Sequence, residues 1–260
     1  MNKEKELLIR KDTAIKAAVE AGRFLKDNFG KVTQIKAKEN ETFVTDIDLK
    51  TDEIITAHIK KSLKEDNIIS EEKPMPELKA EYSWIIDPLD GTHNYIHNID
   101  IFGVSIGVAC GKEGVIGVIY MPVADELYVG VKGQGATLNN HKITVSDRDI
   151  SRATMIFDSS VKYKKDPMLA DLKDLSGRVF NIRMFGSTAR SLSYIAEGKA
   201  EVEIEYNDQV WDFAAGLVLV EEAGGRSTDL EGNPWNIDTA GYIASNNLIH
   251  NEIVKTIGSN

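Results

Sequence analysis

The sequence predicts a mixed fold of helices and sheets, of the α/β (α+β) class, and three observations support this prediction. Residues 5–29 carry apolar side chains at helical spacing, residues 101–145 are rich in β-forming residues between turns, and the remainder alternates strand-like and helix-like segments. No linker, repeat or low-complexity tract interrupts the 260 residues. We therefore expect one domain over residues 1–260, with an α+β half at about 1–148 and an α/β half at about 149–260.

The composition narrows the classes of function. Hydrophobic residues make up 42% of the chain and charged residues 28%, and the net charge is −10. A protein this acidic is poorly suited to bind nucleic acid or an anionic membrane, and residues 1–6 lack the apolar core of a signal peptide. We expect a cytoplasmic protein in which Cys110, the single cysteine, is a buried thiol.

The first half is expected to begin with two helices. The first covers residues 5–29 and ends at Gly30, a residue suited to a helix C-terminus. Thr45-Asp46-Ile47-Asp48 resembles a capping box that opens the second helix. On this stretch alone, Asp48 is explained as a helix-capping acid. A short strand is expected at Ile68-Ile69.

The remaining elements follow from β-rich runs, turn residues and helical spacing. A large antiparallel sheet is predicted from residues 101–109, 115–120, 126–131 and 143–145. The second half is expected to form strands at residues 155–157, 179–185, 201–206, 226–230 and 242–245. Helices are expected at residues 167–175, 211–222 and 248–257, and a further helix is expected to follow Gly186-Ser187-Thr188 and to run through Ala196.

The most informative stretch is Trp84-Ile85-Ile86-Asp87-Pro88-Leu89-Asp90-Gly91-Thr92. Its apolar start indicates a buried strand, which we expect to end at Asp87 because Pro88 lacks the N–H that a central strand needs. Asp87 and Asp90 then share one tight turn, where they repel each other unless a cation or a proton compensates. The following glycine allows close approach of the backbone, and the threonine adds a hydroxyl. We infer that this turn holds a divalent metal and a phosphate together.

Alternatives to this inference differ in their spacing. A phosphatase of the haloacid-dehalogenase type needs Asp-x-Asp, and an EF-hand alternates its ligands over a loop of about twelve residues. An ordinary Pro-Asp-Gly turn with solvated acids remains an alternative on turn chemistry alone. A short helix over residues 93–97 would place its N-terminus beside a phosphate. His93 and His97 have zinc-like spacing, but no glutamate follows His93, so we interpret them as flanking the site without binding zinc.

Further candidate residues lie where predicted strands end or helices begin. Glu71 and Glu72 follow the strand at Ile68-Ile69. Gly186-Ser187-Thr188 is a second candidate anion cradle, which ordinary N-capping explains equally well. Glu205 lies near the end of a strand, and Asp212 lies in a first helical turn, where it caps the helix or binds a ligand.

Two motifs make the chain resemble the inositol monophosphatase family of magnesium-dependent, lithium-sensitive phosphatases. They are the stretch from Trp84 to Tyr95 and the stretch Trp211-Asp-Phe-Ala-Ala-Gly-Leu-Val-Leu-Val-Glu-Glu-Ala-Gly-Gly225, with Glu71-Glu72 upstream of both. The resemblance covers nearly the whole chain. It implies a layered α/β/α/β/α sandwich of the inositol monophosphatase and sugar phosphatase type, usually a homodimer.

The resemblance also implies a role for each matching position. The metal ligands would be Glu71, Asp87, Asp90 and Asp212 through carboxylates and Leu89 through its carbonyl. The residues that orient the attacking water would be Asp48, Thr92 and Glu71, and Glu72 would support them. The phosphate would meet the amides of Gly91 and Thr92, and the rest of the substrate would meet Gly186, Ser187, Thr188, Glu205 and Asp212. Such oxygen ligands select Mg²⁺ over zinc, with two or three ions per site implied.

The chain departs from the family pattern at several positions. Ser70 replaces a commoner glycine, and Thr42-Phe43-Val44-Thr45 stands where Asp-Leu-Val-Thr is more usual. Arg190 would meet a second phosphate of the substrate, or else lie on a helix surface or at a dimer contact. Lys36 and Lys38 are expected to be solvated surface residues.

Three hypotheses for function follow. The first is hydrolysis of inositol 1-phosphate to myo-inositol and phosphate by a metal-activated water. The second is the same chemistry on fructose 1,6-bisphosphate, NADP or 3′-phosphoadenosine 5′-phosphate; in all these cases the partner is a small phosphorylated molecule. The third is a metal-binding interaction protein without catalysis, which the intact set of metal-ligand positions disfavours.

Overall fold

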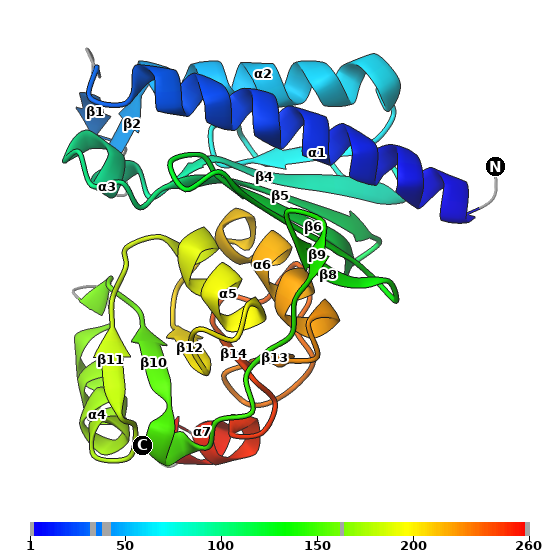
Figure 1. Ribbon diagram of the computed structural model, residues 1–260. Coiled ribbons are helices and arrows are strands. Elements are labelled where there is room, and N and C mark those ends of the chain that lie inside the picture. The colour runs from blue at the N-terminus through cyan, green and yellow to red at the C-terminus, as the bar shows by residue number, and fades with distance from the viewer. Residues whose placement is uncertain (1–2, 32–34, 38–42, 162–163, 258–260) are drawn as a thin grey trace.

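Five layers of helices and sheets make up the computed structural model, which describes residues 3–31, 35–37, 43–161 and 164–257 (Figure 1). Helices α1 (Lys3–Asn28) and α2 (Asp46–Ser62) cover one face of a seven-stranded sheet. Helices α5 (Thr188–Ala196) and α6 (Val210–Glu222) fill the space between that sheet and a five-stranded sheet. Helices α4 (Lys165–Ser176) and α7 (His250–Ile257) lie on the outer face of the second sheet. The predicted mixed α/β layered fold is confirmed.

The two large sheets differ in strand direction. The first sheet has the order β3-β4-β5-β6-β7-β8-β9, in which β3 and β4 are parallel and all later neighbours are antiparallel. Its strands are β3 (Asn67–Ser70), β4 (Tyr82–Asp90), β5 (Gly103–Cys110), β6 (Glu113–Met121), β7 (Glu126–Val131), β8 (Gly135–Leu138) and β9 (His141–Lys142). The second sheet, in the order β11-β10-β12-β14-β13, contains β10 (Thr154–Phe157), β11 (Asn181–Arg183), β12 (Val202–Glu205), β13 (Arg226–Asp229) and β14 (Tyr242–Ser245). The small elements are the pair β1 (Ile35–Ala37) and β2 (Phe43–Thr45), the helix α3 (Thr92–Ile96) and a 3₁₀ turn at Ile150–Arg152.

Two strand predictions were wrong. Strand β4 does not end at Asp87, because the pairing with β5 shifts between Asp87 and Asp90, and this irregularity accommodates Pro88 within the strand. Residues 143–145 form no strand, since the Val145 amide donates to the carbonyl of Ala223 at the end of α6. The strand predicted over residues 179–185 is limited to β11.

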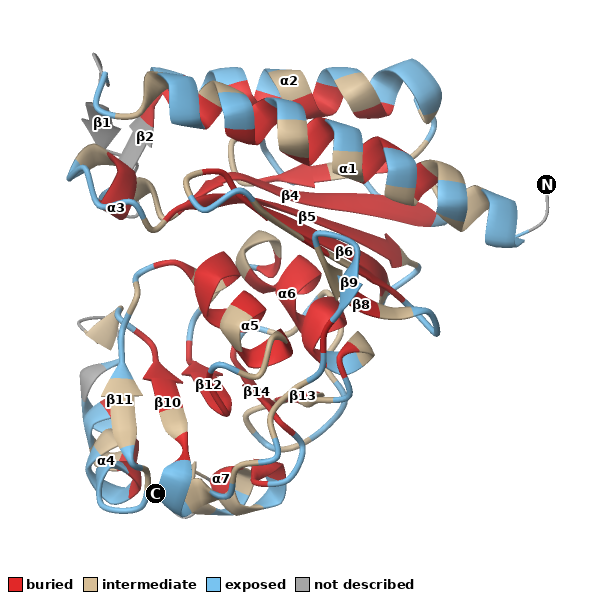
Figure 2. Ribbon diagram, viewed as in Figure 1, coloured by how far each residue is buried: buried red, intermediate tan, exposed pale blue. Residues whose placement is uncertain are grey.

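Apolar side chains are buried on both faces of the seven-stranded sheet. Figure 2 shows its central strands coloured as buried. On one face they pack beneath α1 and α2, and on the other they pack against α5 and α6. The strands β4, β5 and β6 are therefore largely buried, including all nine residues of β4, whereas β8 and β9 at the edge of the sheet are mostly intermediate or exposed. Cys110 does not belong to the fully buried set: it is only half-buried, and its thiol lies 3.4 Å from the Glu81 carboxylate.

A row of three glycines determines how closely α6 approaches the first sheet. Gly107, Gly117 and Gly130 are cross-strand neighbours on β5, β6 and β7. A Cβ atom added at Gly117 would lie 2.0 Å from the carbonyl oxygen of Ala215 in α6. Because no larger residue fits there, the helix backbone rests directly on the strands, and this contact fixes the start of α6, where Asp212 lies.

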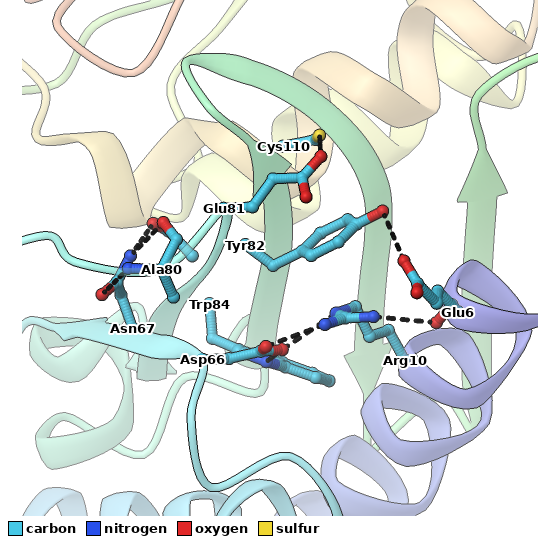
Figure 3. A network of polar contacts seen from close by, with 10 residues as sticks. Glu6, Arg10, Asp66, Asn67, Ala80, Glu81, Tyr82, Trp84 and Cys110 are labelled. Atoms are coloured by element: carbon cyan, nitrogen blue, oxygen red, sulfur yellow. Dashed lines mark hydrogen bonds and ion pairs between the residues drawn. The ribbon is translucent and has the colours of Figure 1, made fainter. Parts of the chain in front are cut away.

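A buried polar network attaches α1 to the start of β4 (Figure 3). The guanidinium of Arg10 donates to both carboxylate oxygens of Asp66, at 2.8 and 2.9 Å, and its Cζ lies 3.6 Å from the centre of the Tyr82 ring. The indole of Trp84 donates to the same carboxylate at 2.9 Å. The network therefore anchors the strand that carries Asp87 and Asp90 at its other end.

Candidate active site

A cavity of about 900 Å³ opens where β4, α3, α5 and α6 meet. The predicted site residues that line it are Glu71, Asp87, Leu89, Asp90, Gly91, Thr92, Gly186, Ser187, Thr188, Glu205 and Asp212. Residues more than a hundred positions apart in the sequence thus share one wall. Two residues with a predicted role, Asp48 and Glu72, do not line the cavity. Asp48 is fully buried behind Thr92.

The bulge of β4 places two carboxylates and a carbonyl at the cavity. Asp87 and Asp90 are 2% and 4% exposed, and the Leu89 amide donates to Asp87 Oδ1 at 3.0 Å. Glu71 joins them because β3 runs parallel to β4, and the Glu71 amide donates to the Ile86 carbonyl at 3.1 Å. The irregular strand end therefore gathers acids that a regular strand would direct to opposite faces.

Helix α2 contacts the segment that carries Glu71 through the side chain of Asp52. The hydroxyl of Ser70 donates to the buried carboxylate of Asp52 at 2.5 Å, and Lys73 forms an ion pair with the same carboxylate. This contact gives a physical reason for the serine at position 70. Glu72, which follows, lies outside the cavity, and its amide donates to Ser70 Oγ.

Thr92 connects the cavity to the start of α2. Its hydroxyl lies 3.1 Å from Asp48 Oδ1 and 3.0 Å from the Leu89 carbonyl. The other oxygen of Asp48 accepts from the Thr45 amide at 2.8 Å, so the predicted capping box is present. Asp48 therefore caps α2 and positions the Thr92 hydroxyl at the same time. Gly91 has a φ of 84°, and a Cβ added there would lie 2.8 Å from the Ile101 carbonyl, which explains the need for glycine.

The N-terminus of α5 lines the cavity beside Asp90. The Ser187 hydroxyl donates to Asp90, and the Ala189 amide donates to Asp90 Oδ2 at 3.0 Å. The side-chain amide of Asn94 lies 2.8 Å from the carbonyl of Phe185, so α3 holds the chain just before Ser187. Ser187 also caps α5, since its oxygen accepts from the Arg190 amide. The same serine thus caps a helix and contacts the predicted metal ligand.

The pKa values of Asp87, Asp90 and Asp212 are raised, so these three carboxyls hold protons more tightly than usual. Burial raises the pKa of Asp90 to about 6, although Ser187 and the Ala189 amide favour its charged form. Burial, followed by the charges of Glu71, Asp90 and Asp212, raises the pKa of Asp87 well above its usual range. Burial and the neighbouring Asp208 do the same for Asp212. Crowded acids of this kind favour a cation that would compensate them.

The donor set fits a hard divalent cation. The groups at this wall are carboxylate oxygens and the carbonyl of Leu89, which suit Mg²⁺ better than zinc. Within the described residues, no three acidic, imidazole or thiol groups are already arranged around one point, so cation binding would require the carboxylates to move closer together.

His93 and His97 stack on each other, with ring centres 4.2 Å apart, and the His97 ring forms a hydrogen bond with the His93 carbonyl.

A sequence model of the inositol monophosphatase family matches residues 10–260. The chain belongs to this family. It is 36% identical over 244 residues to a fructose-1,6-bisphosphatase/inositol-1-monophosphatase of Aquifex aeolicus, covering 92% of this chain and 91% of that one. It is 33% identical to an inositol-1-monophosphatase of Mesorhizobium japonicum, covering 94% of each chain. The solved inositol monophosphatase of Anabaena superposes with a TM-score of 0.88 at 31% identity, covering 98% of this chain and 97% of that one. The family consists of phosphoric monoester hydrolases.

Sequence reasoning missed two acids of this inositol monophosphatase-like cavity. Asp158 directly follows the apolar strand β10, and Asp208 lies in the loop before α6; both line the cavity. Asp158 could have been found from the pattern that singled out Asp87, an acid at the end of an apolar strand. Asp208 gives no such signal in the sequence.

Two predictions about basic residues can be compared with the structure. Arg190 is neither a surface residue nor a phosphate ligand here: it is 5% exposed, pairs with Glu126 at 2.6 Å and lies outside the cavity. Its length lets it reach from α5 to β7, which a small residue cannot do. Lys36 lies in β1, and Lys38 and Thr42 lie outside the described residues.

Proposed function

We propose that the protein is a Mg²⁺-dependent phosphomonoesterase that hydrolyses inositol 1-phosphate to myo-inositol and phosphate. The observation that carries this proposal is that Glu71, Asp87, Asp90 and Asp212 line the same cavity as the Gly91-Thr92 turn. Membership of a phosphatase family supports the reaction class. The cavity volume of about 900 Å³ is ample for a phosphorylated polyol.

The residues divide into groups with distinct tasks. Glu71, Asp87, Asp90, Asp212 and the Leu89 carbonyl would hold two or three Mg²⁺ ions, which supply a water of lowered pKa and neutralise charge on phosphate and leaving group. The Thr92 hydroxyl, fixed by Asp48, orients the attacking water. Backbone amides of Gly91 and Thr92 face the phosphate, and no covalent phosphoenzyme is needed. Glu205 and the Gly186-Ser187-Thr188 segment contact the hydroxyls of the leaving group.

A second candidate substrate is fructose 1,6-bisphosphate. The Aquifex relative, whose name includes both activities, favours it. NADP, 3′-phosphoadenosine 5′-phosphate and the non-catalytic, metal-binding role remain alternatives.

Within the described part of the chain, no helix is long and apolar enough to cross a membrane. The cytoplasmic location, the homodimer and the lithium sensitivity stay predictions.

A phosphate-release screen tests the proposal. Purified protein is incubated with inositol 1-phosphate, fructose 1,6-bisphosphate, NADP or adenosine 3′,5′-bisphosphate, with Mg²⁺ or with EDTA. We expect the highest kcat/KM for inositol 1-phosphate and no release with EDTA. Release that persists with EDTA would contradict the metal requirement. No release from any of these esters with Mg²⁺ present would favour the non-catalytic role.

A further inference from the structure

Glu71 lies in a four-residue turn that begins at the end of β3. The amide of Lys73 donates to the carbonyl of Ser70 at 3.2 Å, so Ser70 and Lys73 are the first and last residues of this turn. Glu71 and Glu72 occupy its two central positions, and Glu71 lines the cavity. The position of the Glu71 carboxylate therefore depends on how firmly the two ends of the turn are held.

One buried carboxylate on α2 contacts both ends of this turn. Asp52 is 2% exposed; its Oδ1 accepts from the Ser70 hydroxyl at 2.5 Å, and its Oδ2 forms an ion pair with the Lys73 ammonium. The same ammonium donates to the hydroxyl of Thr56 at 3.4 Å, one helical turn after Asp52. Because each oxygen of Asp52 contacts a different end, this side chain fastens the whole turn to the helix.

The charge of Glu71 acts on several other acids of the site. Burial is the main cause that raises the pKa values of four carboxyls, and the charge of Glu71 contributes in each case. The four residues are Asp48, Asp87, Asp90 and Asp212. A displacement of the turn would therefore change the charge distribution of the whole acidic cluster.

A divalent cation would have to bring these carboxylates closer together. A ligand on a loosely held turn loses conformational freedom when it binds, and this loss weakens binding. A turn that is held at both ends before binding has less freedom to lose. Its carboxylate is thus expected to bind a cation more tightly than the same carboxylate on a free turn.

We propose that Asp52 is a positioning residue for cation binding: through Ser70 and Lys73 it holds the turn so that Glu71 is already oriented towards a divalent cation. This inference rests on the proposed function, because it takes Glu71 as a metal ligand. It concerns a feature of this chain, since Ser70 replaces a commoner glycine, which has no hydroxyl to donate to Asp52. The competing explanation is that the contact only attaches β3 to α2 and contributes to stability alone.

Mg²⁺ binding to the substrate-free protein tests the inference, with the dissociation constant measured by isothermal titration calorimetry. Ser70→Ala removes one contact without a change of charge, and we expect the Mg²⁺ dissociation constant to rise about fivefold. Lys73→Met removes the other contact and should also weaken binding, although the loss of a positive charge by itself favours a cation. Lys73→Arg keeps a cation for Asp52 and should bind Mg²⁺ nearly as the wild type does.

Lys79→Met is the matched control for charge. Lys79 pairs with Glu77 later in the same connection between β3 and β4, and the two side chains are 73% and 79% exposed. The variant loses the same charge as Lys73→Met but leaves the turn intact, so Mg²⁺ binding should not weaken. Urea denaturation in EDTA gives the free energy of unfolding of each variant and shows that it is folded.

The outcomes separate the inference from the proposed function. Weaker Mg²⁺ binding in Ser70→Ala and Lys73→Met, but not in Lys79→Met, would support positioning by Asp52. If Ser70→Ala is less stable and yet binds Mg²⁺ with wild-type affinity, the contact only attaches β3 to α2 and the inference alone is overturned. Tighter binding in Lys73→Met would overturn it as well. No measurable Mg²⁺ binding by the wild-type protein would instead contradict the proposed metal site and, with it, this inference.

Discussion

Ser187 donates a hydrogen bond to Asp90 across 97 positions of the sequence. Asp90 belongs to the strand β4 of the first sheet, and Ser187 caps α5, which packs between the sheets. The proposed metal ligand and the proposed substrate-binding segment are therefore positioned by one contact. The same contact connects the two halves of the chain at the cavity.

Replacement of Asp90 by asparagine should abolish most of the activity without unfolding the protein. The amide keeps an oxygen that can accept from Ser187, but it lacks the charge that a divalent cation requires. We expect kcat to fall at least about a thousandfold, which corresponds to the loss of several kcal/mol of transition-state stabilisation. Steady-state kinetics with inositol 1-phosphate, alongside circular dichroism, would check this. A folded variant with near wild-type turnover would contradict the role of Asp90.

Removal of the Thr92 hydroxyl should affect turnover more than substrate binding. Thr92→Ala removes the group that Asp48 positions, and we expect kcat to fall about a hundredfold with a change in KM below about threefold. Thr92→Ser retains the hydroxyl and should recover most of the rate. A large rise in KM at constant kcat would assign Thr92 to binding instead.

A methyl group at position 117 should disturb α6. Its Cβ would meet the Ala215 carbonyl at 2.0 Å, so the helix must shift and Asp212 with it. We expect Gly117→Ala to lower the free energy of unfolding by about 3 kcal/mol and to reduce kcat. Gly177→Ala is the matched control, because nothing lies within 4 Å of a Cβ built there. Urea denaturation and kinetics on both variants decide the question; equal stability of the two would refute close packing of α6.

Loss of the buried ion pair at α1 should lower stability. Arg10→Met leaves the Asp66 carboxylate without its bidentate partner, and breaking a buried pair in this way costs about 3 kcal/mol. Arg178→Met breaks the more exposed pair with Glu252 and should cost less than about 1 kcal/mol. Chemical denaturation measures both. A similar loss of free energy of unfolding in the two variants would show that burial does not make the Arg10 ion pair more important for stability.

The buried carboxyl of Glu203 should make stability depend on pH. Among the described residues, neither of its oxygens has a hydrogen-bond partner of normal geometry, although the nearby Ser191 and Tyr242 hydroxyls favour its charged form. Burial raises its pKa well above the usual 4.5, so the folded protein holds this proton more tightly than the unfolded chain does. The contribution of Glu203 to stability is therefore lost as the pH rises from 4.5 towards the folded pKa.

Glu203→Gln removes that titration and tests the sign of the effect. The Tm difference between variant and wild type should be smallest near the usual pKa of 4.5 and should grow in favour of the variant at higher pH. Thermal melts in EDTA across this range measure it. A difference that does not depend on pH would show that Glu203 does not titrate differently in the folded state.

The features that were predicted correctly depend on residues that are close together in the sequence. The capping box at Thr45 and Asp48, and the helical spacing of α1 and α6, depend on neighbours within one or two turns. The course of β4 through Pro88 was missed because the bulge depends on pairing with β5. Asp208 was missed for a related reason, since only tertiary packing brings a loop acid to the cavity.

The two oxygens of Asp48 serve different parts of the molecule, one at the start of α2 and the other at the Thr92 hydroxyl. A compensating mutation elsewhere in the chain can restore the folding of an Asp48 variant, but it cannot restore the orientation of Thr92. In a mutant library, screening for folded protein and screening for activity would therefore give different answers at this position. A stabilising mutation elsewhere in the chain that restores folding, but not activity, in an Asp48 variant would show that this side chain contributes separately to folding and to the orientation of Thr92.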